Sequence, residues 1–215
     1  MKLDIIFATG NGNKIREIEE IITDPGIHVR SMKQAGIAAD PEESGQSFED
    51  NALIKATAVA KNFHQNESVR LSKDIPAVIM SDDSGLCIDA LNGAPGIHSA
   101  RFMGHDTDYT AKMNAILEKL SDVPDEKRTA RFTAAVCAVL VDENDSHIVL
   151  TRSMEGCIAH EIRGVNGFGY DPFFYLPEYG KTSAEIPPEE KNAISHRGKA
   201  LRAVLSALEE HYSGH

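Results

Sequence analysis

The chain opens with an apolar segment that runs straight into a polar turn with two glycines, Thr9–Lys14, and then into a periodic apolar stretch from Ile15. This order predicts a β-strand that leads directly into an α-helix, the first step of an α/β fold. The backbone N–H groups and the dipole of a helix start attract anions, and Lys14 adds a full positive charge. The turn therefore suggests a phosphate site, although an ordinary strand-to-helix connection has the same outline.

The turn matches neither of the two common phosphate-binding loops. A Walker A loop requires Ser or Thr directly after its lysine, but Lys14 is followed by Ile15. A dinucleotide-binding fingerprint requires a third glycine three residues after Gly12, and Ile15 occupies that position as well. A phosphate bound at this turn is therefore expected to be held in a different way.

Alternating helices and strands are expected along the rest of the chain. Apolar residues at helical spacing, capping residues and short apolar runs bounded by Gly and Pro mark these elements. In chain order we expect a helix from Ile15 that ends at Pro25-Gly26, a strand at 28–31, a helix capped by Ser47 that reaches Phe63, a buried strand at 77–80, a helix around 113–120, strands at 129–141 and 146–157 joined by the acidic turn 142–145, and a helix at 196–210. The two long strands are expected to pair as an antiparallel hairpin, within a single domain of residues 1–215.

Charge and composition exclude several classes of protein. The formal net charge is −11, whereas a protein that binds nucleic acid in general is expected to carry a basic face. The sequence contains neither a run of about 18 apolar residues that would span a bilayer nor the long apolar segment of a signal peptide. Its three widely spaced cysteines fit neither a disulfide framework nor a zinc site. These features predict a soluble, cytoplasmic protein whose partners are neither nucleic acid nor membrane.

The strongest chemical signal is a pair of adjacent carboxylates, Asp82 and Asp83, which directly follow the expected buried strand. We expect one of them to face a cleft and the other to cap or support the turn. Such a pair suits Mg²⁺, which prefers oxygen ligands, and general-base work on a water molecule. A haloacid-dehalogenase-type phosphatase is excluded because its Asp-x-Asp motif would need a second Asp where Ser84 stands. An acidic turn capped by Asp82 is the structural alternative.

A second acidic group lies upstream, at Glu42–Gly45. Most Glu-Glu pairs are solvated surface, so this group alone means little. It gains weight because the expected helix that follows carries Asn51 and Lys55 on one face, four residues apart. Lys55 is placed to pair with a carboxylate or with a phosphate.

A third cluster, Gly164–Phe174, interleaves three glycines with aromatic residues. This pattern is typical of a backbone bent closely around a flat ligand, and an aromatic ring offers a stacking face for a base. Asp171 offers an acceptor for base N–H groups. An aromatic loop of the protein core is the alternative, and Phe173 and Phe174 are expected in the core in either case.

The start of the last helix combines His196 with Arg197, preceded by Glu189–Asn192. Cationic side chains at a helix N-terminus lie at the unfavourable end of the dipole. Natural sequences tolerate such local conflicts mainly where they serve a site, although structural caps also place His or Arg there. This segment is therefore a candidate for ligand contacts.

Together these segments closely resemble one family, the inosine triphosphate pyrophosphatases, or non-canonical purine nucleoside triphosphate pyrophosphatases. The motifs that carry the resemblance are Thr9-Gly10-Asn11-x-x-Lys14, Glu43-Ser44-Gly45-x-Ser47-Phe48-x-x-Asn51-Ala52-x-x-Lys55, Asp82-Asp83-Ser84-Gly85-Leu86, Gly93-Ala94-Pro95-Gly96-x-x-Ser99-Ala100-Arg101, Phe168-Gly169-Tyr170-Asp171-Pro172 and Ser195-His196-Arg197-Gly198. They follow in order over nearly the whole chain. The departures, a longer polar connector after Phe63 and the residues Cys87 and His98, touch none of these motifs.

The resemblance implies a fold and an activity. The fold would be α/β, with an elongated mixed central sheet between two lobes and the nucleotide in the cleft between them. The activity would be Mg²⁺-dependent hydrolysis of ITP, dITP and XTP between the α and β phosphates, releasing the monophosphate and pyrophosphate. Such an enzyme cleanses the nucleotide pool, and members of the family are usually homodimers.

The resemblance also implies roles for individual residues. Asp83 would accept the proton of the attacking water and would bind the metal together with Glu43, while Asp82 and Lys14 would support catalysis. Arg197, which is only a donor, would favour the 6-oxo group of hypoxanthine over the 6-amino group of adenine. Substrate contacts are implied for Thr9, Gly10, Asn11, Gly12, Asn13, Lys14, Lys55, Ser84, Phe168, Gly169, Tyr170, Asp171, Lys191, His196 and Arg197.

Two other functions stay open at the level of the sequence. A regulatory protein would hold a triphosphate without cleaving it, but pure binding does not need the intact pair Asp82 and Asp83. A broader pyrophosphatase would act on damaged pyrimidine nucleotides and differs only in its substrates. Release of pyrophosphate from a panel of nucleotides separates the three.

Overall fold

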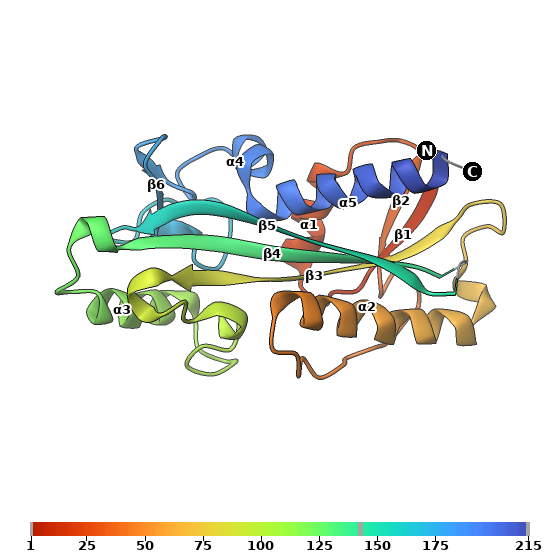
Figure 1. Cartoon of the computed structure of the whole chain (residues 1–215), viewed down its shortest axis with the longest axis horizontal. Helices are drawn as coiled ribbons and strands as arrows, with labels where there is room; N and C mark the ends of the chain where they lie inside the picture. Colours follow the sequence, from red (N-terminus) through yellow and green to blue (C-terminus); the bar gives the residue numbers. More distant parts are fainter. Residues whose placement is uncertain (1, 142–143, 214–215) are drawn as a thin grey trace. The chain divides into compact units, whose positions relative to one another are not determined.

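A computed structural model describes residues 2–141 and 144–213 and has an α/β fold with a mixed sheet (Figure 1). The strands of this sheet lie in the order β2-β1-β3-β4-β5-β6-β7. The strands are β1 (Leu3–Phe7), β2 (Ile27–Ser31), β3 (Ala77–Ile88), β4 (Thr129–Leu140), β5 (Ser146–Ile158), β6 (Phe174–Leu176) and β7 (Lys181–Thr182). The helices are α1 (Gly12–Ile21), α2 (Phe48–Gln65), α3 (Tyr109–Lys119), α4 (Pro188–Ile194) and α5 (His196–Ser213). The elements expected from the sequence are therefore present, most with ends within a few residues of the expected ones.

The chain divides into two compact units. The first unit comprises Met1–Asp83, Ala134–Arg152 and Arg197–His215, and the second comprises Ser84–Thr133 and Ser153–His196. The boundaries fall inside β3, β4 and β5, so each of these long strands contributes residues to both units. The expectation of a single domain over residues 1–215 stays a prediction.

The sheet of the first unit is buried on both faces. β1 pairs in parallel with both β2 and β3, a pairing that normally requires helices on the two faces of a sheet. Helix α2 lies on one face and helices α1 and α5 lie on the other (Figure 1). In β1, Ile6 packs toward α2 while Ile5 and Phe7 pack toward α1 and α5. This alternation follows from the two-residue period of a strand.

The strand β3 is longer than expected, and this changes the setting of the two aspartates. The sequence predicts a buried strand that ends at Met80, but β3 continues without interruption to Ile88. The alternation of β3 therefore runs through the acidic motif, and adjacent side chains point to opposite faces. The expectation that one aspartate caps or supports a turn is wrong, because no turn is present at 81–85.

The start of α2 is fixed by its capping residues. The side chain of Ser47 accepts a hydrogen bond from the backbone N–H of Asp50 at 3.1 Å, as the sequence predicts. The carboxylate of Asp50 accepts in return from the N–H of Gln46, also at 3.1 Å, one residue earlier than in a standard capping box. These contacts tie the residues that precede α2 onto its first turn.

The second unit has an apolar core of its own. Helix α3 contributes Met113 and Ile116 to this core, and they lie in one buried cluster with Leu86 of β3 and Phe132 of β4. The strand β6 pairs antiparallel with β5 and with β7. The cluster also contains Phe173, which agrees with the expectation of an aromatic core position.

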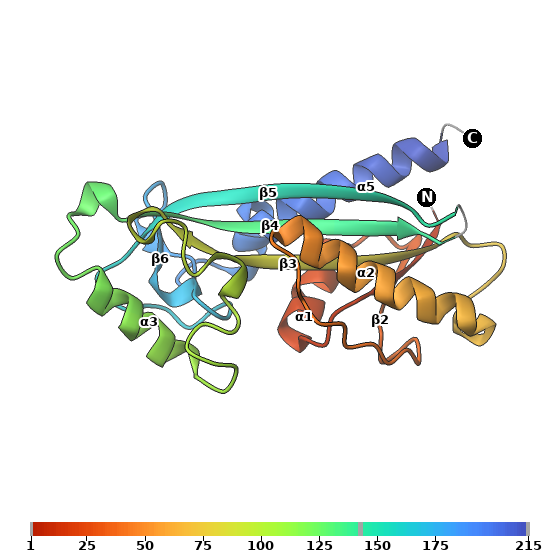
Figure 2. The same cartoon turned by 60° about the horizontal axis from the view of Figure 1, so that its bottom comes forward.

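The expected hairpin agrees with the positions of β4 and β5. These strands are neighbours in the sheet and lie side by side in Figure 2. Only residues 141–145 connect them, too few for the crossover that a parallel pair would need, so the pair is antiparallel. Part of the acidic turn predicted at 142–145 lies outside the described residues. In the described part of the chain, no helix has both the length and the apolar character needed to cross a bilayer.

Candidate active site

The glycine-containing turn leads into α1, and its N-terminal N–H groups already have a partner within the protein. Asn11 is the N-cap of α1, and its side-chain oxygen accepts from the N–H groups of Asn13 and Lys14 at 3.0 and 3.3 Å. The N–H groups of Asn13 and Lys14, which the sequence predicts to attract an anion, therefore have Asn11 as a hydrogen-bond partner in this structure. What the turn presents is an exposed surface at Gly10–Asn13.

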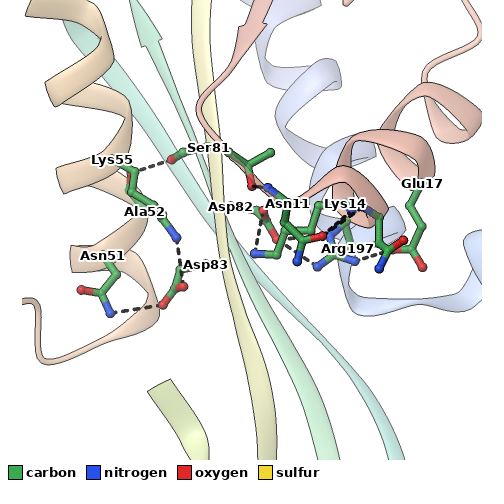
Figure 3. Close-up of polar contacts among 12 residues, drawn as sticks. Asn11, Lys14, Glu17, Asn51, Ala52, Lys55, Ser81, Asp82, Asp83 and Arg197 are labelled. Carbon is green, nitrogen blue, oxygen red and sulfur yellow. Dashed lines mark hydrogen bonds and ion pairs between the residues drawn. The ribbon is translucent and has the colours of Figure 1, made fainter. Parts of the chain in front are cut away.

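Asp82 is the centre of a buried cluster of charges on the α1 and α5 face of β3 (Figure 3). The amino group of Lys14 lies 3.0 Å from Asp82 Oδ1. Arg197, the second residue of α5, donates from Nε and Nη2 to Asp82 Oδ2, both at 3.1 Å. The Nη1 of Arg197 donates to the carboxylate of Glu17, one helical turn after Lys14 on α1.

Burial and charge oppose each other in this cluster. Burial alone would raise the pKa of Asp82, but the charges of Lys14 and Arg197 outweigh it, so the pKa lies far below the ordinary range. Burial would lower the pKa of Arg197, but Asp82 and Glu17 raise it overall. Burial lowers the pKa of Lys14, an effect that its contact with Asp82 offsets only in part. The carboxylate of Asp82 is thus ionised at neutral pH and pairs with both Lys14 and Arg197.

Asp83 belongs to a second cluster, on the α2 face of the same strand (Figure 3). The amino group of Lys55 lies 3.1 Å from Asp83 Oδ1 and 2.8 Å from Glu43 Oε1. Asn51, one turn earlier on α2, donates from Nδ2 to Asp83 Oδ2 at 3.2 Å. The acidic loop before α2, the helix itself and the motif in β3 therefore meet at one point, as the sequence suggested for Lys55.

The pKa of the Asp83 carboxyl is raised, whereas that of Asp82 is lowered. Burial raises the pKa of Asp83, and the nearby carboxylate of Glu43 adds to this, so that the charges of Lys55 and Lys14 do not bring it back to its ordinary value. Burial would lower the pKa of Lys55, but Asp83 and Asp82 raise it overall. A carboxylate with a raised pKa is a stronger base than an ordinary one, and such groups cluster at catalytic sites.

The oxygen atoms around Lys55 are suited to a hard cation. Glu43 Oε1 and Asp83 Oδ1 already converge on one positive charge, the ammonium of Lys55. Magnesium takes oxygen ligands and is usually bound through one or two carboxylates together with waters and substrate phosphates. Among the described residues, no group of three or more His, Cys, Asp or Glu side chains is placed to hold a metal by itself. The pair Glu43 and Asp83 therefore fits Mg²⁺ bound together with a phosphate ligand.

In the second unit, the loop at 164–171 is built around the carboxylate of Asp171. This carboxylate accepts from Phe168 N at 2.8 Å, from Lys191 Nζ at 2.6 Å and from Ser183 Oγ at 2.7 Å. Gly167 has φ +72°, and a Cβ there would lie 2.2 Å from Asp171 Oδ2. The close bend of the backbone expected from the glycines is therefore present, and what it encloses is Asp171 rather than an open acceptor for a base.

The aromatic residues of this loop differ in exposure. Tyr170 is buried, donates from its hydroxyl to Ser99 O at 3.0 Å and stacks on Phe173. Phe168 is half-buried, and the amino group of Lys191 lies 5.4 Å from its ring centroid. Phe168 is therefore more accessible than the core residue Tyr170. His196, also buried, stacks on Phe132 at 5.0 Å between ring centroids.

The structure thus groups the predicted site residues within each unit. In the first unit it brings together Lys14, Asp82 and Arg197 on one face of the sheet and Glu43, Lys55 and Asp83 on the other. In the second unit it brings together Phe168, Asp171 and Lys191, while Ser84 follows in β3 and His196 lies against Phe132.

In the charge clusters of the first unit, two residues were not assigned a role from the sequence. Glu17 follows Lys14 by one helical turn, and Asn51 precedes Lys55 by one turn. Each lies on the same helix face as a predicted site residue, and this spacing is the sequence signal that points to them.

Comparison with known proteins gives a family for the chain. A model of the Ham1 family matches residues 5–207. A dITP/XTP pyrophosphatase of Bacillus cereus is 39% identical over 210 residues, which cover 98% of this chain and 97% of the relative. A dITP/XTP pyrophosphatase of Shigella flexneri is 42% identical over 204 residues, which cover 95% of this chain and 97% of the relative.

Solved structures agree with these relatives. A Ham1 protein from Coxiella burnetii is 39% identical with a TM-score of 0.80, and the match covers 97% of this chain and 99% of that one. The Ham1 protein of Staphylococcus aureus is 35% identical with a TM-score of 0.80 and the same coverage. The sequence resemblance, the α/β class with a mixed sheet and the enzyme class, a nucleoside triphosphate pyrophosphatase, are thereby confirmed. The chain belongs to the Ham1 family.

Proposed function

We propose that this protein hydrolyses the non-canonical purine nucleoside triphosphates dITP, XTP and ITP to the monophosphate and pyrophosphate, and so removes them from the nucleotide pool. The names of its relatives as dITP/XTP pyrophosphatases support the substrate class. The observation that carries the proposal is the convergence of Glu43 and Asp83 on the ammonium of Lys55. One or two carboxylates, together with substrate phosphates, are the usual ligands of Mg²⁺ at sites of phosphate chemistry.

The proposed reaction is an in-line displacement at the α-phosphorus with Asp83 as general base. A water oxygen forms a bond to the α-phosphorus while the bond from that phosphorus to the bridging α–β oxygen breaks. The proton of the water passes to the carboxylate of Asp83, and pyrophosphate leaves with the electron pair of the broken bond. The raised pKa of Asp83 supports this role, because a base is most effective when its pKa approaches the working pH.

Charged residues of the first unit would bind the metal and the phosphates. Glu43 and Asp83 would hold Mg²⁺, which neutralises phosphate charge and assists departure of the leaving group. Lys14 and the exposed turn at Gly10–Asn13 would hold the phosphate tail. Lys55 would stabilise the charge that develops on the phosphate oxygens.

We propose that the nucleoside is contacted by the residues that the sequence resemblance implies. Phe168 would stack on the base, and Arg197 would favour a 6-oxo group. The other proposed contacts are Thr9, Ser84, Gly169, Tyr170, Asp171, Lys191 and His196. We also propose that the enzyme works in the cytoplasm as a homodimer.

Product analysis with a substrate panel tests the proposal. Purified protein is incubated with ITP, dITP, XTP, ATP, GTP and damaged pyrimidine triphosphates, with Mg²⁺ or with excess EDTA. We expect pyrophosphate and the monophosphate from the first three, and no turnover in EDTA. The proposed function would be contradicted by release of orthophosphate in place of pyrophosphate, or by equal rates of hydrolysis for ATP and ITP. Binding of ITP without formation of any product would indicate a regulatory protein.

A further inference from the structure

The buried side chain of Asn51 connects the two segments that carry Glu43 and Asp83. Its side chain lies on the first turns of α2, and the residue has no solvent-exposed surface. It contacts two segments that are distant in the sequence, the loop that carries Glu43 and the strand that carries Asp83. A buried amide is costly unless it is hydrogen-bonded, so both of its contacts matter to the fold.

The orientation of the amide is fixed by its partners. Asn51 Oδ1 accepts from the backbone N–H of Gly45 at 2.9 Å, and a backbone N–H is only a donor. The Nδ2 group therefore lies at the other side, where it donates to Asp83 Oδ2 at 3.2 Å. Since Lys55 contacts the other oxygen of Asp83, both oxygens of this carboxylate are held from α2.

The loop approaches α2 so closely that only glycine fits at position 45. A Cβ on Gly45 would lie 2.5 Å from Asp50 Cβ and 2.7 Å from Asn51 Oδ1. The next residue, Gln46, donates its N–H to the carboxylate of Asp50. This docking fixes the backbone two residues after Glu43, whose carboxylate meets Lys55.

From this arrangement we infer that Asn51 is a positioning residue for the proposed metal-binding carboxylates. One side of its amide holds the loop that presents Glu43, and the other side holds Asp83, so the distance between the two carboxylates depends on it. The inference rests on the proposed function, in which Glu43 and Asp83 act together. Residues that orient metal ligands typically change metal affinity or activity about 10- to 100-fold when they are replaced.

Two substitutions separate the two contacts. Asn51→Ala removes both hydrogen bonds. Asn51→Asp keeps the shape and an acceptor for the N–H of Gly45, but it cannot donate to Asp83 and places a like charge beside it. Asn62→Ala is the matched control, because Asn62 lies on the same helix and donates to the backbone oxygen of Ala58, one turn earlier.

The experiment measures Mn²⁺ binding by electron paramagnetic resonance in the presence of α,β-methylene-dITP, which supplies the phosphate ligands but is not cleaved between the α and β phosphates, together with kcat, KM for dITP and thermal unfolding. We expect Asn51→Ala to weaken Mn²⁺ binding about 10- to 100-fold and to lower kcat by a similar factor, with a smaller change in KM. We expect Asn51→Asp to lower kcat at least about 10-fold while it retains Mn²⁺ binding. Asn62→Ala is expected to match the wild-type protein in every measurement.

The outcomes distinguish this inference from the proposed function. Wild-type Mn²⁺ affinity in folded Asn51→Ala, or wild-type kcat in Asn51→Asp, would overturn the inference while the enzyme itself stays active. If Asn51→Ala fails to fold, the kcat of Asn51→Asp tests the inference by itself: a lowered kcat supports it and a wild-type kcat overturns it. If the wild-type protein binds Mn²⁺ but cleaves no triphosphate, the proposed function fails, and the Mn²⁺ titrations of the variants alone decide the role of Asn51.

Discussion

Asp82 and Asp83 are neighbours in β3, yet their carboxylates point to opposite faces of the sheet and pair with lysines from different helices. Asp82 lies 3.0 Å from Lys14 of α1, and Asp83 lies 3.1 Å from Lys55 of α2. The strand period alone produces this separation. Two carboxylates that are adjacent in sequence therefore have separate environments and opposite pKa shifts, which predicts separate roles.

The proposed role of Asp83 as general base predicts a loss of turnover without a loss of binding. Asp83→Asn retains the shape and the contact with Lys55 but cannot accept a proton from water. We expect kcat for dITP to fall about 10²- to 10⁴-fold, the usual contribution of a general base. Steady-state kinetics checks kcat, and calorimetry with dITP checks binding. Asp74→Asn, an exposed aspartate before β3, is the control, and near-normal turnover of Asp83→Asn would remove Asp83 from this role.

The raised pKa of Asp83 also predicts that the same substitution stabilises the fold. A carboxyl whose pKa is raised in the folded state contributes its stability in acid, and this stability is lost as the pH rises through the folded-state pKa. At pH 7 the wild-type protein therefore carries an unfavourable buried charge that Asp83→Asn lacks. We expect a higher Tm for the variant at pH 7 and a smaller difference near pH 4. A lower Tm at pH 7 would show that the ion pair with Lys55 outweighs burial.

The lowered pKa of Asp82 predicts that its contribution to stability depends on pH in the opposite direction. Its pKa is lowered in the folded protein, so its stabilisation is present above the unfolded-state pKa of about 4 and is lost as the pH falls toward the folded-state pKa. Asp82→Asn leaves Lys14 and Arg197 without this anion and is expected to lower the Tm at pH 7. The difference from the wild-type protein should shrink as the pH falls below about 4. A difference that is constant between pH 7 and pH 3 would contradict the assignment.

The amino group of Lys14 is expected to act on the substrate in both the ground state and the transition state. Lys14→Ala should raise KM and lower kcat, because charge on the phosphates redistributes as the α–β bond breaks. Kinetics with dITP measures both constants. Lys33→Ala, which removes a lysine from the turn after β2, is the control. An unchanged kcat/KM in Lys14→Ala would place Lys14 outside the site.

Much of the fold was predictable because it depends on local patterns. Apolar residues at helical spacing located α3, with Met113 and Ile116 buried as expected, and the Ser47 cap located α2. The end of β3 was not predictable in this way. Strand signals are read from apolar runs, whereas β3 continues through polar residues that find partners in the helices on either side, such as the Ser81 hydroxyl on Ala52 O at 2.5 Å.

For the candidate site, the sequence indicated which charged residues to consider but not how they pair. The sequence placed Lys55 near an acidic loop, and the structure pairs it with Glu43 of that loop and with Asp83. No local pattern indicated that the carboxylate of Asp171 is enclosed by its own loop. This enclosure depends on contacts from Ser183 and Lys191, which are 12 and 20 residues away. Long-range pairing of charged groups depends on the packing of the elements, which a local pattern does not specify.

Arg197 is expected to influence both stability and base selection. Its guanidinium bridges Asp82 and Glu17 in a buried setting, and removing one partner from a buried ion pair typically costs about 3–5 kcal/mol. We therefore expect Arg197→Ala to lower the free energy of unfolding by about that amount, as measured by urea denaturation. Arg202→Ala, an exposed arginine farther along α5, is the control.

The same substitution decides how a 6-oxo base is recognised. An arginine donates and never accepts, so in the proposed site Arg197 would favour the oxygen of hypoxanthine and disfavour the amino group of adenine. A site built to pair with one polar group rejects analogues that lack it by up to about 10⁴-fold. In the fraction of Arg197→Ala that is folded, kcat/KM for ITP should fall more than kcat/KM for ATP, so that the ratio narrows. If the ratio is unchanged while stability falls as expected, Arg197 serves the Asp82 cluster alone, and another group reads position 6.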